Sequence, residues 1–228
     1  MYKPINAHLK STFLMATVVI GFAIFMTNNN VPVTFAERNS ANAANPLTEN
    51  WTGPYGGIPP FDKVKVADFK PALEEAMEQN LGEAVLISAN KAAPTFENTI
   101  AEMERSGHTL TRIQIIYGIW SSNMSSPEFR TVESEMDPRL AAFSDKITQN
   151  TALFKRIEAV YNSPEKAKLT PEQQRLTWLY YTNFVRAGAK LDSAAKTRLS
   201  EINQELAKRF TRFSDENDCS GQKLITDQ

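Results

Sequence analysis

The sequence has one cysteine and two histidines, and this shortage excludes several kinds of site. With Cys219 as the only thiol, the chain can form neither an internal disulfide nor a cysteine-based metal site. A zinc or iron site needs three or four ligands in one place. His8 and His108 are the only histidines, so the sequence offers too few ligands of this kind. A catalytic triad would have to use His108, which we expect to be a solvated or capping side chain, and no Gly-x-Ser-x-Gly turn exposes a nucleophile. The sequence therefore predicts no catalytic, cofactor-binding or metal-binding residue.

The sequence also lacks an excess of either charge, because 25 basic residues face 26 acidic ones. Such a balance gives no basic patch for a phosphate backbone, so we expect no nucleic-acid partner. The glycines in residues 53–57 bring no lysine-serine pair, which argues against nucleotide binding. Three pairs of nearby carboxylates are interpreted as solvated helix surfaces rather than acid–base pairs. These pairs are Glu74 with Glu78, Glu102 with Glu104, and Glu133 with Glu135.

The N-terminal segment, residues 1–44, has the layout of a secretory signal and a linker. Lys3 and Lys10 precede an uncharged apolar run over residues 13–26. That run is shorter than the roughly 20 residues that span a bilayer. Cleavage is expected after Ala43 or Ala44, and an uncleaved signal anchor is the alternative. Either outcome predicts a periplasmic or otherwise extracytoplasmic protein, with a membrane association only if the signal stays uncleaved.

Residues 45–67 form a second region, which is rich in proline, glycine and aromatic residues. Proline and glycine break helices and central strands, so we expect an extended arm here. Trp51, Tyr55 and Phe61 are interpreted as anchors that hold this arm on a larger body. A proline-rich ligand for a recognition domain is the rival interpretation.

From residue 68 to 214 apolar residues recur at helical spacing, and no sustained strand alternation occurs. Helix starts are predicted at Asp68, Thr95, Ser126, Thr170 and near Asp192, where a capping side chain precedes an apolar pattern. Short loops between successive helices predict an antiparallel array. The fold class is therefore all-α.

The predicted last helix carries apolar residues that no later element can cover, and the following residues, 215–228, are polar and unpatterned. We expect those residues to be a divergent, disordered tail. Large apolar faces around Ile115 and Trp178 also exceed what one small bundle can hide. Part of this surface is expected to contact a partner.

Three stretches carry a family resemblance, and they lie in order along the chain: WTGPYGGIPPFDKVKVADFKPALEEAM, PTFENTIAEMERSG and YNSPEKAKLTPEQQRLTWLYYTNFVRAGAKL. They resemble the N-terminal region of bacterial peptidyl-dipeptidases, which belong to the thimet oligopeptidase family of zinc metallopeptidases. The resemblance runs from about Asn45 to about Ser214. Residues 68–214 would then be the helical N-terminal peptidase domain.

The resemblance implies a zincin-type, mostly helical channel protein that releases dipeptides from the C-termini of short peptides. In that family the N-terminal helices form one channel wall, and a His-Glu-x-x-His helix in the C-terminal half binds Zn2+. This sequence has no such motif, so no catalytic or metal-binding residue carries over, and the chain alone is expected to be inactive.

The leading interpretation is thus a truncated peptidase, with a frameshift or early stop at the change of pattern near residue 215. The missing catalytic half is a possible partner. A free-standing helical module that binds peptides or a partner outside the cytoplasm is the alternative. Pairing with a separately encoded catalytic half is a third interpretation.

Overall fold

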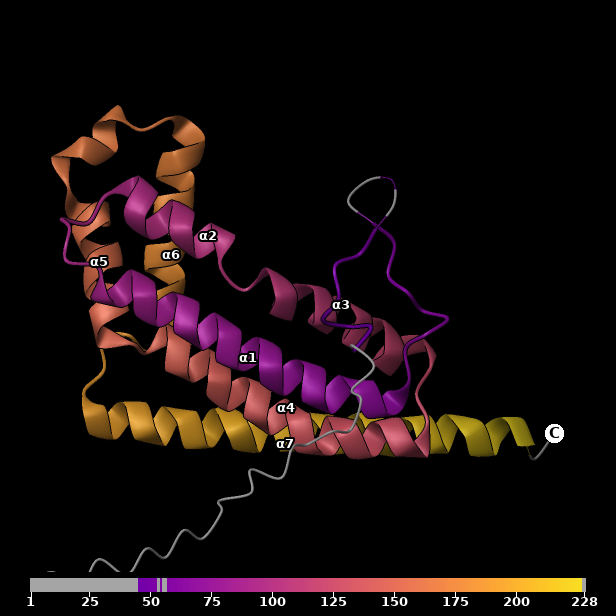
Figure 1. The fold of residues 1–228 in the computed structure, drawn as a ribbon. Coiled ribbons are helices and arrows are strands. Elements are labelled where there is room, and N and C mark those ends of the chain that lie inside the picture. The colour runs from indigo at the N-terminus through magenta and orange to yellow at the C-terminus, as the bar shows by residue number, and fades with distance from the viewer. Residues whose placement is uncertain (1–44, 53, 55–56, 227–228) are drawn as a thin grey trace, which may run out of the picture. The chain divides into compact units, whose positions relative to one another are not determined.

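The computed structural model describes residues 45–226 except 53, 55 and 56, and every regular element in this part of the chain is a helix (Figure 1). This confirms the all-α prediction. The predicted signal segment, with both of its cleavage sites, lies outside the described residues. Within the described part, no helix combines the length and apolar character needed to cross a membrane.

The elements follow one another along the chain with short connections. In order they are α1 (Val66–Ala89), the π-helix η2 (Phe96–Ala101), α2 (Glu102–Arg105), α3 (His108–Asn123), α4 (Pro127–Thr148), α5 (Thr151–Asn162), the 3-10 helix η3 (Pro164–Lys168), α6 (Pro171–Arg186) and α7 (Ser193–Thr226).

Most helix starts are where the local sequence predicts them. The side chains of Thr95, Ser126 and Thr170 each accept a hydrogen bond from the backbone N–H three residues later, as N-cap residues do. Asp192 does the same for Ala195 at the start of α7, with an N–O distance of 2.8 Å. These four starts are confirmed.

The predicted start at Asp68 is wrong by three residues, because the N-cap of α1 is Lys65. The Asp68 carboxylate instead accepts a hydrogen bond from the Lys65 backbone N–H at 2.7 Å. An acidic side chain at the third helical position can satisfy a free N–H at the helix start as well as a capping residue can. The helix therefore begins earlier than the position of the aspartate suggests.

One core cluster lies between α1, α3 and α4 and is built on aromatic rings. The ring of Phe69 from α1 packs edge-on against Trp120 of α3 and Phe129 of α4, at 5.2 Å between centroids in each case. Tyr117 lies against Phe129 at the same separation. Edge-to-face contacts of this kind add stabilisation beyond the buried area itself.

A second core cluster joins the end of α1 to η2, α5 and α6, and a buried arginine organises it. Arg156 of α5 donates hydrogen bonds to the carbonyl oxygens of Asn90 at 2.6 Å and Ala92 at 3.0 Å, and to Asn98 Oδ1 at 2.8 Å. Burial lowers the pKa of this guanidinium. The loop after α1 is thus tied to α5 through charge-assisted bonds.

The N-terminal arm packs on the first cluster, as the sequence predicts. Leu47 is fully buried in that cluster, and Trp51 packs against it beneath the guanidinium of Arg112. The ring of Phe61 stacks on Trp120 at 6.5 Å. Two of the three predicted aromatic anchors are therefore confirmed, and Tyr55 lies outside the described residues.

The prediction of a disordered tail at residues 215–228 is wrong over the part that the structure describes, because α7 continues as a helix to Thr226. Helices propagate through their own backbone hydrogen bonds, so loss of the apolar pattern does not by itself end them. An ion pair between Arg212 and Glu216, at 3.4 Å, spans the predicted boundary. The structure thus gives no break at residue 215, and the predicted truncation there stays a prediction.

Candidate functional site

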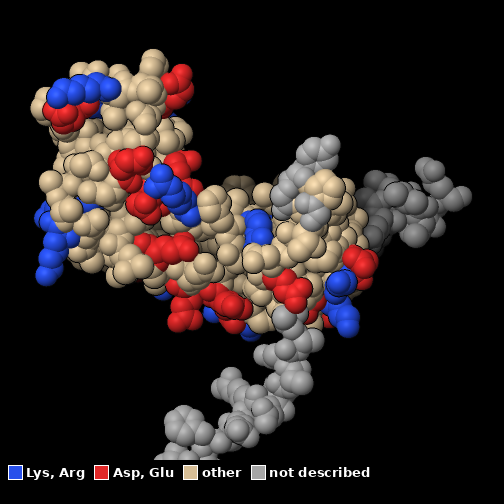
Figure 2. All heavy atoms as spheres, turned by 45° about the horizontal axis from the view of Figure 1, so that its top comes forward, with Lys and Arg blue, Asp and Glu red and all other residues tan. Residues whose placement is uncertain are grey.

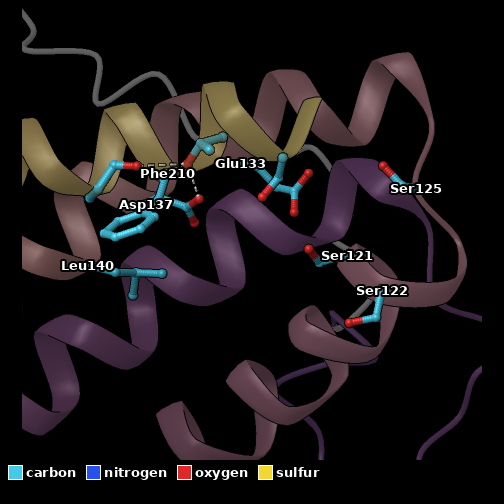
Figure 3. Close-up of a pocket in the computed structure, with 10 residues that line it drawn as sticks. Ser121, Ser122, Ser125, Glu133, Asp137, Leu140 and Phe210 are labelled. Atoms are coloured by element: carbon cyan, nitrogen blue, oxygen red, sulfur yellow. Dashed lines mark hydrogen bonds between the residues drawn. The ribbon is translucent and has the colours of Figure 1, made fainter. Parts of the chain in front are cut away.

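The hollow between the α3–α4 turn and α7 is the candidate site, because it brings acidic side chains and hydroxyls together (Figure 3). Its volume is about 570 Å³. Figure 3 shows serines at one end, Phe210 and Leu140 at the other, and two carboxylates between them. The lining residues are Ser121, Ser122, Ser125, Glu133, Asp137, Leu140, Ala207, Phe210, Thr211 and Ser214.

Asp137 joins three helices at this hollow. Its two carboxylate oxygens accept hydrogen bonds from the hydroxyl of Tyr117 on α3, at 2.7 Å, and from that of Thr211 on α7, at 2.5 Å. Burial raises the pKa of Tyr117, and the neighbouring Asp137 carboxylate raises it further. The tyrosine therefore stays a neutral donor at ordinary pH, and Asp137 acts here as a fixed acceptor.

Glu133 corrects a sequence-based prediction, because its side chain is buried rather than solvated, with 8% of its surface exposed. A glutamate side chain normally faces solvent, although Glu133 is one helical turn from the buried residues Phe129 and Met136 of α4. In the structure α7 covers that face of α4. The sequence could not show this, because the residues that cover the face lie about seventy positions away along the chain.

The remaining members of the predicted carboxylate pairs lie on helix surfaces, and most of them have partners. Glu74 pairs with Arg139, Glu102 with Arg105, and Glu135 with both Lys70 and Arg139. The hydroxyl of Tyr180 donates to Glu104 at 2.7 Å, while Glu78 is exposed. None of these five residues lines the candidate hollow.

His108 is the first residue of α3 and is exposed to solvent, as predicted. In the part of the chain that the structure describes, no group of three or more histidine, cysteine, aspartate or glutamate side chains could hold a metal ion. The residues present there thus do not fit the zinc centre that the resemblance implies for the whole enzyme.

Ser106 and Gly107 form the joint between α2 and α3, and this joint has a steric basis. Gly107 adopts a left-handed backbone with φ of 72°, and a Cβ there would lie 2.9 Å from the side chain of Asn80. Its N–H donates to the Glu83 carboxylate at 2.7 Å. Another residue here would have to adopt a strained left-handed backbone and displace the Asn80 side chain.

The hollow can accept hydrogen bonds but has no arrangement for covalent catalysis. Carboxylates and hydroxyls can hold an amine or amide donor. Sequence reasoning did not single out Asp137 or Thr211, although Asp137 follows Glu133 by one helical turn of α4. That spacing was the available signal.

Comparison with known proteins places these helices in a family. The sequence model of the neurolysin/thimet oligopeptidase N-terminal domain matches residues 71–196. The chain is 33% identical to the dipeptidyl carboxypeptidase of Escherichia coli K12 over 170 residues, which is 75% of this chain and 25% of that protein. The Salmonella typhimurium dipeptidyl carboxypeptidase gives 33% over 172 residues, with the same coverage.

A plant relative extends the comparison. The probable cytosolic oligopeptidase A of Arabidopsis thaliana is 26% identical over 194 residues, which is 82% of this chain and 26% of that protein. The chain thus spans about a quarter of the length of the curated relatives it matches. On the family match, which covers more than half of its residues, the chain belongs to the neurolysin/thimet oligopeptidase family and contains that family's N-terminal domain.

Proposed function

We propose that this chain is the N-terminal portion of a zinc-dependent peptidyl-dipeptidase and forms one wall of its peptide channel. The observation that carries the proposal is the family match over residues 71–196, together with 33% identity to two dipeptidyl carboxypeptidases. The activity proposed for the whole enzyme is release of dipeptides from the C-termini of short peptides.

In this proposal the zinc chemistry belongs to residues other than those described. A catalytic zinc takes three protein ligands and a water molecule, and its role is to activate that water or polarise the scissile carbonyl. The described residues offer no such ligand set. Their contribution is to bind and position peptide.

The candidate hollow supports a binding role. The Glu133 and Asp137 carboxylates and the hydroxyls of Ser121, Ser122 and Ser125 line it, and all of these oxygens can accept hydrogen bonds. Peptide N–H and amino groups are donors of the matching kind. No described side chain there is arranged as a nucleophile beside a histidine base.

The alternative function is a non-catalytic module that binds peptides or a partner outside the cytoplasm. Apolar side chains that stay exposed favour it, among them Ile115 at 56% and Trp178 at 38%. On the face shown in Figure 2, acidic and basic side chains are interspersed on a largely uncharged surface, so neither sign dominates that face. Such a surface suits a protein or peptide.

Export is part of the proposal and rests on residues 1–44 alone. Fractionation of cells that express the complete chain tests it. Recovery in the periplasmic fraction, shortened by about 43 residues, is the expected result. Full-length protein confined to the cytosolic fraction would contradict export.

Peptide hydrolysis tests the main proposal. The purified chain is assayed with Zn2+ on a blocked tripeptide, alone and after co-expression with the part of the E. coli dipeptidyl carboxypeptidase that follows its matched quarter. We expect no turnover by the chain alone and chelator-sensitive turnover by the pair. Chelator-sensitive turnover by the chain alone would refute it, and binding of peptide without hydrolysis by the pair would favour the module.

A further inference from the structure

Helix α7 carries an apolar stripe that nothing in the described part of the chain buries. The stripe consists of Ile202, Leu206, Phe210 and Phe213, and is called the α7 stripe below. Steps of four, four and three residues place these side chains on one face of a helix. Their exposed fractions are 41%, 45%, 67% and 64%. An amphipathic helix normally turns such a face toward a core.

The side of α7 that packs on α4 is a different and more polar face. Asn203 donates to Asp145 at 2.8 Å and Thr211 donates to Asp137. Near the start of α7, on the same face, Lys196 donates to the carbonyl oxygen of Gln149, which follows α4. At 3.6 residues per turn this face is centred about a third of a turn from the α7 stripe. Figure 1 shows α7 running along α4, so the stripe stays exposed although α7 is docked.

The edges of the α7 stripe are electrically neutral. Arg209 pairs with Glu205 at 2.8 Å and Arg212 with Glu216 at 3.4 Å, each within one turn of the helix. An open surface hollow of about 440 Å³ lies on this side of α7, lined by Leu206, Arg209, Phe210, Arg212, Phe213 and Glu216. A stripe of aromatic and aliphatic side chains with paired charges at its rim fits a protein surface better than phosphates or anionic lipid.

The position of the α7 stripe in the chain indicates which protein covers it. The match to the N-terminal domain ends at residue 196, so the stripe lies beyond the matched domain. The matched relatives are about four times as long as the part that aligns. The stripe is therefore on the element by which the N-terminal domain leads into the rest of such an enzyme.

We propose that the α7 stripe is the docking surface for the remainder of the peptidase, the part that follows the N-terminal quarter in the relatives. This inference rests on the proposed function and names the surface through which the chain takes part in it. Phe210 and Phe213, the most exposed members, are expected to carry most of the binding, as buried aromatic side chains do at interfaces.

The test is capture of that remainder by variants of the complete chain. The chain carries an affinity tag. It is co-expressed with the remainder of the E. coli dipeptidyl carboxypeptidase, which is the part that follows the quarter aligned with this chain. The double variant F210Q/F213Q removes the aromatic surface, and L206Q is a second, smaller change. Lys208, exposed on another face of α7, provides the control K208Q. Helical circular dichroism is recorded for each purified chain.

We expect the unchanged chain and K208Q to retain the remainder, F210Q/F213Q to retain at least about tenfold less, and L206Q to fall between them. The proposal is overturned by equal capture with F210Q/F213Q, or by failure of the unchanged chain to capture the remainder. It is also overturned if the stripe instead holds a second copy, seen as self-association that F210Q/F213Q abolishes.

The two proposals fail in different ways. If F210Q/F213Q captures the remainder and the pair formed with the unchanged chain hydrolyses peptide, only the docking surface is wrong. If capture depends on the stripe but the pair shows no hydrolysis, or if the chain alone hydrolyses peptide, only the proposed function is wrong.

Discussion

Helix α4 makes apolar contacts on one side and hydrogen bonds on another. Toward α1 and α3 it presents Phe129 and Met136, which are fully buried among aromatic rings. Toward α7 it presents Asp137 and Asp145, which accept hydrogen bonds from Thr211 and Asn203. The first side is a hydrophobic core, and the second holds α7 mainly through polar contacts, with Phe210 of the α7 stripe at the edge of the hollow between the two helices. The difference indicates that α7 has its apolar face available for another body.

The largest effect is expected in the aromatic core. Phe129→Ala leaves a cavity between Phe69 and Tyr117 and should lower the free energy of unfolding by about 3–5 kcal/mol. Urea unfolding followed by circular dichroism measures it. An effect below about 1 kcal/mol would mean that this cluster is not the main source of stability.

A smaller effect is expected at the α4–α7 interface. Asn203→Ala removes the donor to the Asp145 carboxylate, which is only 7% exposed, and should cost about 1–3 kcal/mol. The same unfolding experiment applies, with Lys208→Ala as the control on the exposed side of α7. Equal stability of the two variants would show that the polar contacts do not hold α7 on α4.

The α7 stripe itself should contribute almost nothing to the stability of the isolated chain. F210Q/F213Q is expected to change the free energy of unfolding by no more than about 0.5 kcal/mol, because both rings are mostly exposed. A loss of several kcal/mol in urea would contradict this and would mean that the stripe packs within the chain.

The smallest effect is expected at an exposed ion pair between α4 and α1. The hydrogen bond from Lys70 holds the pKa of Glu135 below its ordinary value, with help from the charges of Lys70 and Arg139. A carboxyl whose pKa is lowered by folding stabilises the folded state above its unfolded pKa, and that contribution is lost as pH falls through the folded pKa. Glu135→Gln should therefore destabilise slightly at neutral pH and not at low pH. Urea unfolding at the two pH values measures this. An equal loss of stability at neutral and at low pH would rule out the ion pair as the cause.

The sequence predicted the helix starts well where the residues that form the N-cap lie within one helical turn of each other. The caps at Thr95, Ser126 and Thr170 depend on residues within a few positions of each other. Such contacts can be inferred from spacing alone. This is why the all-α class and most helix starts were predicted correctly.

The candidate site was predicted less well, because it depends on contacts between distant residues. Glu133 lines a hollow shared with residues of α7, and Asp137 accepts a hydrogen bond from Thr211, 74 residues further along the chain. The extent of α7 was missed for a related reason, since helix continuation past residue 215 needs no apolar pattern. The buried guanidinium network of Arg156 gave no local signal at all.

Amide hydrogen exchange of the chain, alone and in complex with the remainder of the E. coli relative, tests most directly whether α7 keeps its apolar face for the rest of the peptidase. We predict that the amides of α7 from Ile202 to Phe213 become much more protected in the complex, while those in the aromatic core of α1 change little. A complex that forms and leaves exchange in α7 unchanged would contradict the account.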